Sequence, residues 1–309
     1  MAASAAKALT PVCVELGGKD PAVVLDDLSN SDFTRVASIL MRGTFQSAGQ
    51  NCIGIERVIA LPSVYNRLIE YLTPKIRALQ PGSVLNTDTQ TPIDIGASIS
   101  DAGFSKLETL IEDAVNQGAR LLAGGKRYNH PSYPSGHYFT PTFIADVTPS
   151  MEIAQTELFA PVFLLMRADS VTNAISIANS TPYALGASVY GSSTHDLELF
   201  ARNVHAGMVA INDFAVFYMV QLPFGGTKGS GYGRFAGKEG LRSVCNQKSI
   251  TRDRWSWAGI KTGIPPPMDI PLQGSGAGER AWGMAQGIVW LGYGDLRGMI
   301  RGLRGVLGV

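Results

Sequence analysis

The chain has 309 residues, of which 45% are hydrophobic and 17% charged, and its formal net charge is +1. This length allows about two domains with a sizeable core, and the nearly balanced, dispersed charge argues against a nucleic-acid partner. Three cysteines without a CxxC pair argue against a disulfide framework or a metal site and predict a reducing, cytoplasmic location. No stretch reaches the roughly 18 uncharged apolar residues of a transmembrane helix.

The predicted elements alternate between strand and helix along most of the chain. Short β-branched runs indicate strands, and apolar residues recurring at three and four indicate helices. In chain order we expect strands at 11–16 and 21–25, a helix from Asp32 to about Gly49, a strand at 55–61, helices from Pro62 and over 104–117, strands at 119–125, 138–144 and 160–166, a helix at 171–178, a strand at 186–190, a helix at 195–204 and a strand at 207–211. This order predicts an α/β fold with an open, mostly parallel sheet and flanking helices.

After Trp257 the composition changes. Residues 255–279 are rich in Pro and Gly and are expected to form a linker, and residues 280–309 form a separate tail. If the tail is helical, one apolar seam is formed by Val289, Tyr293, Leu296, Ile300, Leu303 and Leu307. Arg297, Arg301 and Arg304 lie mostly off this seam.

The tail's glycines oppose a helix. Gly298, Gly302 and Gly305 each cost about 1 kcal/mol relative to alanine, so the segment is expected to be largely unfolded in water. Two interpretations stay open: a disordered or non-native tail, such as translated intron sequence, or an amphipathic segment that becomes helical on an anionic lipid surface, which would place the protein peripherally on an intracellular membrane.

Cys52 lies in the stretch "FQSAGQNC", a polar, glycine-containing turn between a helix and a strand. Most lone cysteines are small buried hydrophobes, and we expect this of Cys13 and Cys245. Unpaired backbone amides in a loop can serve an oxyanion, so the surroundings of Cys52 favour a nucleophile.

Glu15 ends an apolar strand and precedes two glycines in "ELGGKDP". Open α/β sheets place ligands at the carboxyl ends of their strands, where this carboxylate is expected. A solvated charge or a salt bridge to Lys19 is the alternative.

Four motifs in order, "VELGGK", "GQNC", "ELFAPV" and "PFGGTKGSGYGR", resemble the aldehyde dehydrogenase superfamily over about residues 8 to 254. The resemblance implies that Cys52 is the nucleophile and Glu15 the general base. It also implies that Glu157 holds the nicotinamide ribose hydroxyls and that Phe159 packs near the nicotinamide, with core packing as the alternative for Phe159. Ala160 stands where the common pattern has glycine, so a local backbone difference is expected.

The implied reaction is oxidation of an aldehyde to a carboxylic acid with NAD or NADP, through a thiohemiacetal and a thioester on the cysteine. The alternative is a noncatalytic interaction module derived from such an enzyme. The formal GxGxxA at Gly231, Gly233 and Ala236 lacks the strand and helix of a Rossmann motif. In the family this segment is a loop, so Phe224 is expected to shape the substrate tunnel and support the Cys52 loop.

The resemblance also implies a domain organisation. Residues 1–19 match the end of a dinucleotide-binding domain, 20–240 the catalytic domain, and 241–254 the returning strand of an oligomerisation element. Only 14 residues precede Glu15, so the chain resembles the C-terminal half of a family member, which if complete would be a homo-oligomer. Because the helix start that receives the pyrophosphate is absent, weak nicotinamide binding by this chain alone is expected.

Overall fold

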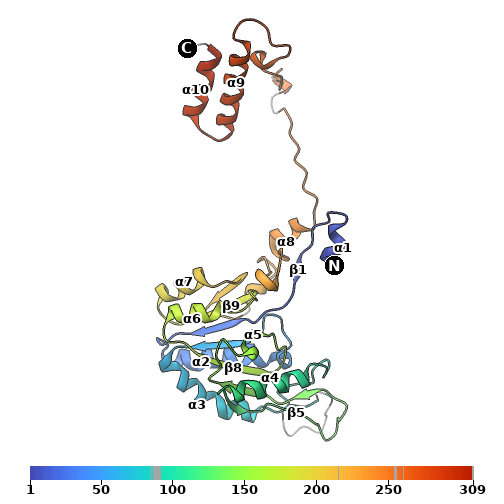
Figure 1. Cartoon of the computed structure of the whole chain (residues 1–309), viewed down its shortest axis with the longest axis vertical. Helices are drawn as coiled ribbons and strands as arrows, with labels where there is room; N and C mark the ends of the chain where they lie inside the picture. Colours follow the sequence, from blue (N-terminus) through green and yellow to red (C-terminus); the bar gives the residue numbers. More distant parts are fainter. Residues whose placement is uncertain (84, 86–91, 215, 254–255, 260, 308–309) are drawn as a thin grey trace. The chain divides into compact units, whose positions relative to one another are not determined.

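The computed structural model describes the chain except residues 84, 86–91, 215, 254–255, 260 and 308–309. It contains two compact units, Met1–Asn246 and Gln247–Val309 (Figure 1). The first unit therefore includes both predicted segments 1–19 and 20–240. Within the described residues, no helix is long and apolar enough to cross a membrane.

The first unit is built on an open, mostly parallel sheet, as predicted, and this sheet has seven strands. Its strand order is β10-β9-β2-β3-β8-β7-β4, and every neighbouring pair is parallel except β7 and β4. The strands are β2 (Pro21–Val24), β3 (Arg57–Ala60), β4 (Arg120–Ala123), β7 (Thr142–Ala145), β8 (Val162–Arg167), β9 (Gly186–Tyr190) and β10 (Met208–Ile211). Central β2 pairs Ala22 with Val58 on one side and with Ser188 on the other.

Helices flank both faces of this sheet (Figure 1). Ala22 and Val24 pack on the face covered by α2 (Asn30–Phe45) and α3 (Pro62–Ala78). Val23 and Leu25 alternate to the other face, covered by α4 (Phe104–Asn116), α6 (Val171–Ala178) and α7 (Thr194–Asn203). The near-continuous apolar strand sequences are explained by this burial on both sides.

Two small antiparallel sheets lie beside the main one. β1 (Val14–Glu15) pairs with β11 (Gly231–Tyr232), and β5 (Arg127–Tyr128) pairs with β6 (Tyr138–Phe139). The predicted strand at 138–144 is therefore two strands in different sheets. Short helices α1 (Ala2–Ala6), α5 (Glu152–Gln155) and α8 (Gly237–Ser243) complete the unit.

The strand expected at 241–254 is absent from the described part of that range. Residues 241–243 end α8, and residues 244–253 have no strand assignment. A strand requires a partner for its amides and carbonyls, and none of the described residues pairs with this segment.

The second unit contains a helical hairpin. α9 (Ala277–Gly292) and α10 (Leu296–Leu307) pack against each other, and the linker before them carries two short 3-10 turns, Ser256–Ala258 and Pro266–Met268. The expectation of a largely unfolded tail is wrong, because most of its residues are helical. The expectation of one continuous seam is also wrong, because a turn at Tyr293 and Gly294 separates the two helices. The burial of Gly305 and the side chain of Leu307 lie outside what the structure describes.

Candidate active site

Three turns meet at one end of the main sheet. Glu15 precedes β2, Cys52 precedes β3 and Glu157 precedes β8, so each residue approaches the amino end of a parallel strand. The expected position at the carboxyl ends is therefore wrong. Glu15 ends a strand, but that strand is β1, which belongs to the small sheet with β11.

The glycine turn after Glu15 holds two carboxylates. The Gly17 amide donates to Glu15 Oε1 and the Gly18 amide donates to Glu157 Oε1, both at 3.1 Å. Gly17 has a φ of 74°, and a Cβ added there would overlap the Glu157 carboxylate. Glycine is thus required both for the backbone conformation and for the close approach of Glu157.

A buried ion pair connects this turn to the next. Lys19 Nζ lies 2.6 Å from Glu56 Oε2, and Glu56 also accepts hydrogen bonds from the amides of Leu158 and Phe159, at 3.1 and 3.0 Å to Oε1. Lys19 thus pairs with Glu56 and not with Glu15, so the alternative of a Lys19–Glu15 salt bridge is wrong. Sequence reasoning missed Glu56, although a carboxylate inside the apolar run "IERVIAL" was a signal.

Phe159 is exposed rather than packed in the core. The residue is 45% exposed. Its φ of 51° lies in the left-handed region that non-glycine residues seldom adopt. The hydrogen bond from its amide to Glu56 helps to hold this conformation. The core-packing alternative for Phe159 is therefore wrong, whereas the next residue, Ala160, is buried.

The loop that delivers Cys52 is tightly bent. Ser47, Ala48 and Gly49 have φ values of 56°, 54° and 74°, three left-handed residues in a row. A Cβ on Gly49 would overlap the Ala160 carbonyl, so the loop packs directly against the turn that carries Phe159. These contacts bring the cysteine and glutamate motifs together.

Most amides around Cys52 are already paired, contrary to the expectation. The amides of Gln50, Asn51 and Gly54 donate to backbone carbonyls within the loop, and that of Ile53 donates to Asn51 Oδ1. The Cys52 and Ile53 amides still lie close enough to the thiol to favour its anion.

The Cys52 thiol is half-buried and is not activated in this chain. Burial is the main cause that raises its pKa to about 11, and the negative charges of Glu15 and Asp20 raise it further against the two amides. At neutral pH the group is therefore a thiol, and a proton acceptor or a nearby positive charge is needed for nucleophilic attack.

Cys13 and Cys245 are both exposed, so the expectation of buried thiols is wrong for both. Cys13 immediately precedes β1, a strand of two residues, and Cys245 follows α8. Such short elements offer little apolar surface to cover a side chain.

Asp20 is a second group that sequence reasoning missed. It is 5% exposed, and its Oδ2 atom has no hydrogen-bond partner among the described residues. A negative charge on Asp20 raises the pKa of the Cys52 thiol. Burial raises the pKa of this carboxyl well above its ordinary value, against the opposing effects of the Gly186 amide and Arg57. Burial likewise raises the pKa of Glu157, with further contributions from Glu56 and Glu15.

Phe224 lies beneath the cysteine loop. It is 5% exposed, belongs to the same apolar cluster as Ile53 and Cys52, and packs on the Phe235 ring at 4.6 Å. The adjoining Gly231 begins β11 rather than the phosphate-binding turn of a βαβ unit, which agrees with the rejection of a Rossmann motif.

Phe214, not identified from the sequence, links this cluster to a cavity. It packs with both the Cys52 cluster and the α2 face. A cavity of about 350 Å³ is lined by Gln46, Phe214, Val216, Tyr218 and Met219.

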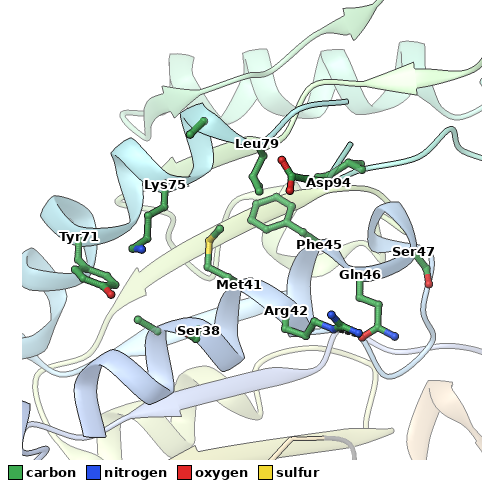
Figure 2. Close-up of a pocket in the computed structure, with 13 residues that line it drawn as sticks. Ser38, Met41, Arg42, Phe45, Gln46, Ser47, Tyr71, Lys75, Leu79 and Asp94 are labelled. Atoms are coloured by element: carbon green, nitrogen blue, oxygen red, sulfur yellow. Dashed lines mark hydrogen bonds between the residues drawn. The ribbon is translucent and has the colours of Figure 1, made fainter. Parts of the chain in front are cut away.

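A second cavity, of about 660 Å³, lies between α2 and α3 (Figure 2). Met41, Phe45, Tyr71 and Leu79 line it together with the charged Lys75, Arg42 and Asp94. Glu15, Cys52 and Glu157 do not line it, although Gln46 and Ser47 at the start of the Cys52 loop do. Nor do the described residues contain a cluster of three or more His, Cys, Asp or Glu side chains that could hold a metal.

Comparison with known proteins gives the family. The model of the aldehyde dehydrogenase family matches residues 1–250. An aldehyde dehydrogenase-like protein of Schizosaccharomyces pombe is 51% identical over 294 residues, 95% of this chain and 54% of its own length. That alignment is longer than the family match and extends into the second unit.

Two further proteins resemble the first unit. The succinate-semialdehyde dehydrogenase [NADP(+)] of Mycobacterium leprae is 34% identical over 248 residues, 80% of this chain and 52% of its own length. A crystal structure of a point mutant of betaine aldehyde dehydrogenase from Staphylococcus aureus with NAD+ superposes with a TM-score of 0.71 and 32% identity, covering 78% of this chain and 47% of that one.

The chain thus spans about half the length of the relatives it matches. The sheet topology agrees with that of the solved neighbours, and the family match covers the three turns that carry the candidate site residues. The chain belongs to the aldehyde dehydrogenase family.

Proposed function

We propose that this chain carries the catalytic centre of an NAD- or NADP-dependent aldehyde dehydrogenase, with Cys52 as nucleophile and Glu15 as general base. The observation that carries the proposal is the convergence of three turns: the Gly17–Gly18 amides hold Glu15 and Glu157, and Gly49 packs the Cys52 loop on the turn of Phe159. Motifs far apart in the sequence thereby share one site.

The residues present fit the nicotinamide half of a dinucleotide. The Glu157 carboxylate can accept from two vicinal ribose hydroxyls, and the exposed Phe159 ring offers an apolar face beside it. Held there, a nicotinamide would supply the hydride acceptor for oxidation of the carbon attached to Cys52.

The chain's own residues account for the other steps. The Cys52 thiol first gives its proton to a base, and the thiolate then attacks the aldehyde carbon. The C–S bond forms as the C=O π bond opens to an oxyanion. After oxidation of that carbon, Cys52 holds an acyl thioester. Water then loses a proton to Glu15 and attacks the thioester, the C–S bond breaks, and a carboxylic acid and the free thiol are released.

We infer the class of aldehyde from the lining of the 350 Å³ cavity. Its described lining is apolar apart from Gln46 and the Tyr218 hydroxyl and contains no cationic side chain. We infer an uncharged, apolar aldehyde rather than one that carries a carboxylate. Comparing kcat/KM for a medium-chain alkanal and for succinate semialdehyde tests this, and preference for succinate semialdehyde would contradict it.

Nicotinamide reduction tests the proposed function. With aldehyde and NAD or NADP, the wild-type protein should form the reduced cofactor, and Cys52→Ala should form none. Cys13→Ala and Cys245→Ala serve as matched thiol controls and should keep the wild-type rate. Equal rates for Cys52→Ala and wild type would overturn the assignment.

A noncatalytic interaction module is the second candidate. The raised pKa of the Cys52 thiol favours it, since a protonated thiol is a poor nucleophile. Cofactor reduction that depends on Cys52 excludes this alternative, while its absence together with unreactive Cys52 at high pH supports it.

A further inference from the structure

The helical hairpin of the second unit has an unusual distribution of side chains. Among its described residues the buried positions are four glycines, Gly283, Gly287, Gly298 and Gly302. Most of its large apolar side chains are instead exposed, whereas Met284 and Met299 are half-buried. The exposed ones are Trp282, Ile288, Val289, Trp290, Leu291, Tyr293, Leu296, Ile300 and Leu303. A hairpin stable in water normally buries such residues between its helices.

The glycines explain why α9 and α10 cannot cover these side chains. A Cβ on Gly302 would lie 2.5 Å from the Gly287 nitrogen, and one on Gly298 would lie 2.6 Å from the Trp290 ring. The backbones are thus in close contact, as in the small-xxx-small packing of helices in lipid. No space is left between them for an apolar core.

Apolar and basic residues occupy separate stripes on α10. Leu296, Ile300 and Leu303 recur at four and three and are 63%, 49% and 39% exposed. Arg297, Arg301 and Arg304 follow the same spacing one position later, and α10 contains no acidic residue. The helix therefore has an exposed apolar stripe beside a basic one.

We propose that this hairpin docks on an anionic lipid bilayer and lies in its interface. The apolar stripe would enter the acyl boundary, the arginines would contact lipid phosphates, and Trp282 and Tyr293 would lie at the headgroup level. Helices of 16 and 12 residues are about 24 and 18 Å long, shorter than the roughly 30 Å hydrocarbon core. The hairpin is therefore an interfacial element rather than a spanning one.

Charge favours lipid over a second copy of the chain. A two-fold dimer contact would use the same patch on both chains and would bring two rows of arginines together. An anionic surface neutralises this row, with each arginine contributing about 1 kcal/mol, or roughly fivefold, to binding.

Binding of the full chain to vesicles tests the proposal. All four tryptophans of the sequence, Trp255, Trp257, Trp282 and Trp290, follow residue 246, so fluorescence excited selectively in tryptophan reports on the chain after that residue. With phosphatidylserine/phosphatidylcholine vesicles at low salt we expect flotation with the vesicles and a blue-shifted emission. Phosphatidylcholine alone, or high salt, should largely abolish both.

Two sets of variants separate the contributions. Changing Arg297, Arg301 and Arg304 together to Gln should lower the partition coefficient on the order of 100-fold. Ile300→Asn with Leu303→Asn removes apolar burial without changing charge and should also release the protein. The matched control changes the exposed Lys106, Lys126 and Arg202 of the first unit to Gln and should stay within about twofold of wild type.

The proposal is overturned if wild-type protein does not float with anionic vesicles. It is also overturned if the arginine variant and the control lose binding equally. Should the Ile300/Leu303 variant change the oligomeric state by light scattering while wild type ignores vesicles, a second copy is the occupant instead.

Discussion

Lys19 and Glu56 form an ion pair of 2.6 Å between side chains that are 0% and 9% exposed. The pair joins two of the turns that build the candidate site, because Lys19 follows the Gly17–Gly18 turn and Glu56 holds the amides of Leu158 and Phe159. Burial lowers the pKa of Lys19, and the Glu56 carboxylate opposes that shift. The buried pair thereby links the two turns.

Breaking this pair should therefore destabilise the protein strongly. Lys19→Met leaves the Glu56 charge buried without its cation, at a cost of about 3 to 5 kcal/mol in the free energy of unfolding. Urea denaturation measures it. Arg202→Met breaks the exposed Arg202–Glu198 pair and is the control, with an expected change below about 1 kcal/mol. Similar losses for both variants would contradict the role of the buried pair.

Gly17 should be sensitive to a single methyl group. Gly17→Ala combines a left-handed backbone with overlap of the Glu157 carboxylate, whereas Gly118→Ala has a φ of 104° but open space around the new Cβ. Both share a conformational cost of about 1 kcal/mol or more, and overlap should add about 1 to 3 kcal/mol at Gly17 alone. Thermal denaturation of the two variants measures the difference, and equal melting temperatures would show that Glu157 does not pack on Gly17.

The thiols should react with iodoacetamide in an order set by exposure and charge. Exposed Cys13 and Cys245 should be alkylated first at pH 8, and Cys52 last, with its rate rising as the pH approaches about 11. Glu15→Gln should speed alkylation of Cys52, because the Glu15 charge raises its pKa. Peptide mass spectrometry gives the three rates. Glu198→Gln on the exposed face of α7 is the control, and a slower Cys52 in Glu15→Gln would contradict the electrostatic account.

Asp20 should make stability depend on pH in a defined direction. Its pKa is raised in the folded protein, so the folded state holds the proton to higher pH than the unfolded state, and stability falls as pH rises above the ordinary value of 3.8. Asp20→Asn removes this loss. The variant should melt a few degrees higher than wild type at pH 8, with a smaller difference at pH 4. A wild-type protein more stable than the variant at pH 8 would mean that Asp20 is ionised and favourably held.

The sequence predicted the sheet well because its strands carry strong local signals. Runs such as "PAVVL" and "APVFLLM" are apolar at nearly every position, which is typical of strands buried on both faces. In the helices between them, apolar residues recur at intervals of three and four. The same reasoning failed where structure depends on partners. The segment at 241–253 has apolar residues but no neighbouring strand, and the cysteine beside β1 is exposed because that strand has two residues.

The sequence predicts which residues form the candidate site, and that assignment stays a prediction, but it does not predict how their turns are linked. Glu15, Cys52 and Glu157 were recognised through motifs, whereas the links between their turns depend on Glu56 and on glycine contacts that only the fold reveals. In the tail, the sequence argument fails because it treats glycine only as a residue that opposes a helix. Gly298 and Gly302 instead allow two helices to approach each other.

The most direct test of the proposed chemistry is acylation of Cys52 by p-nitrophenyl acetate at pH 9, a reaction that needs no cofactor. Thiolate attack breaks the ester C–O bond, releases nitrophenolate and leaves an acetyl thioester, which water hydrolyses with Glu15 as base. The two exposed thiols would also be acylated, so the test uses a background of Cys13→Ala with Cys245→Ala as its wild type. This protein should turn over, Cys52→Ala should release no burst, and Glu15→Gln should release one nitrophenolate per chain and then stall with an acetyl group on Cys52 by mass spectrometry. A Cys52→Ala protein with the wild-type burst, or a Glu15→Gln protein with wild-type steady-state turnover, would contradict the account.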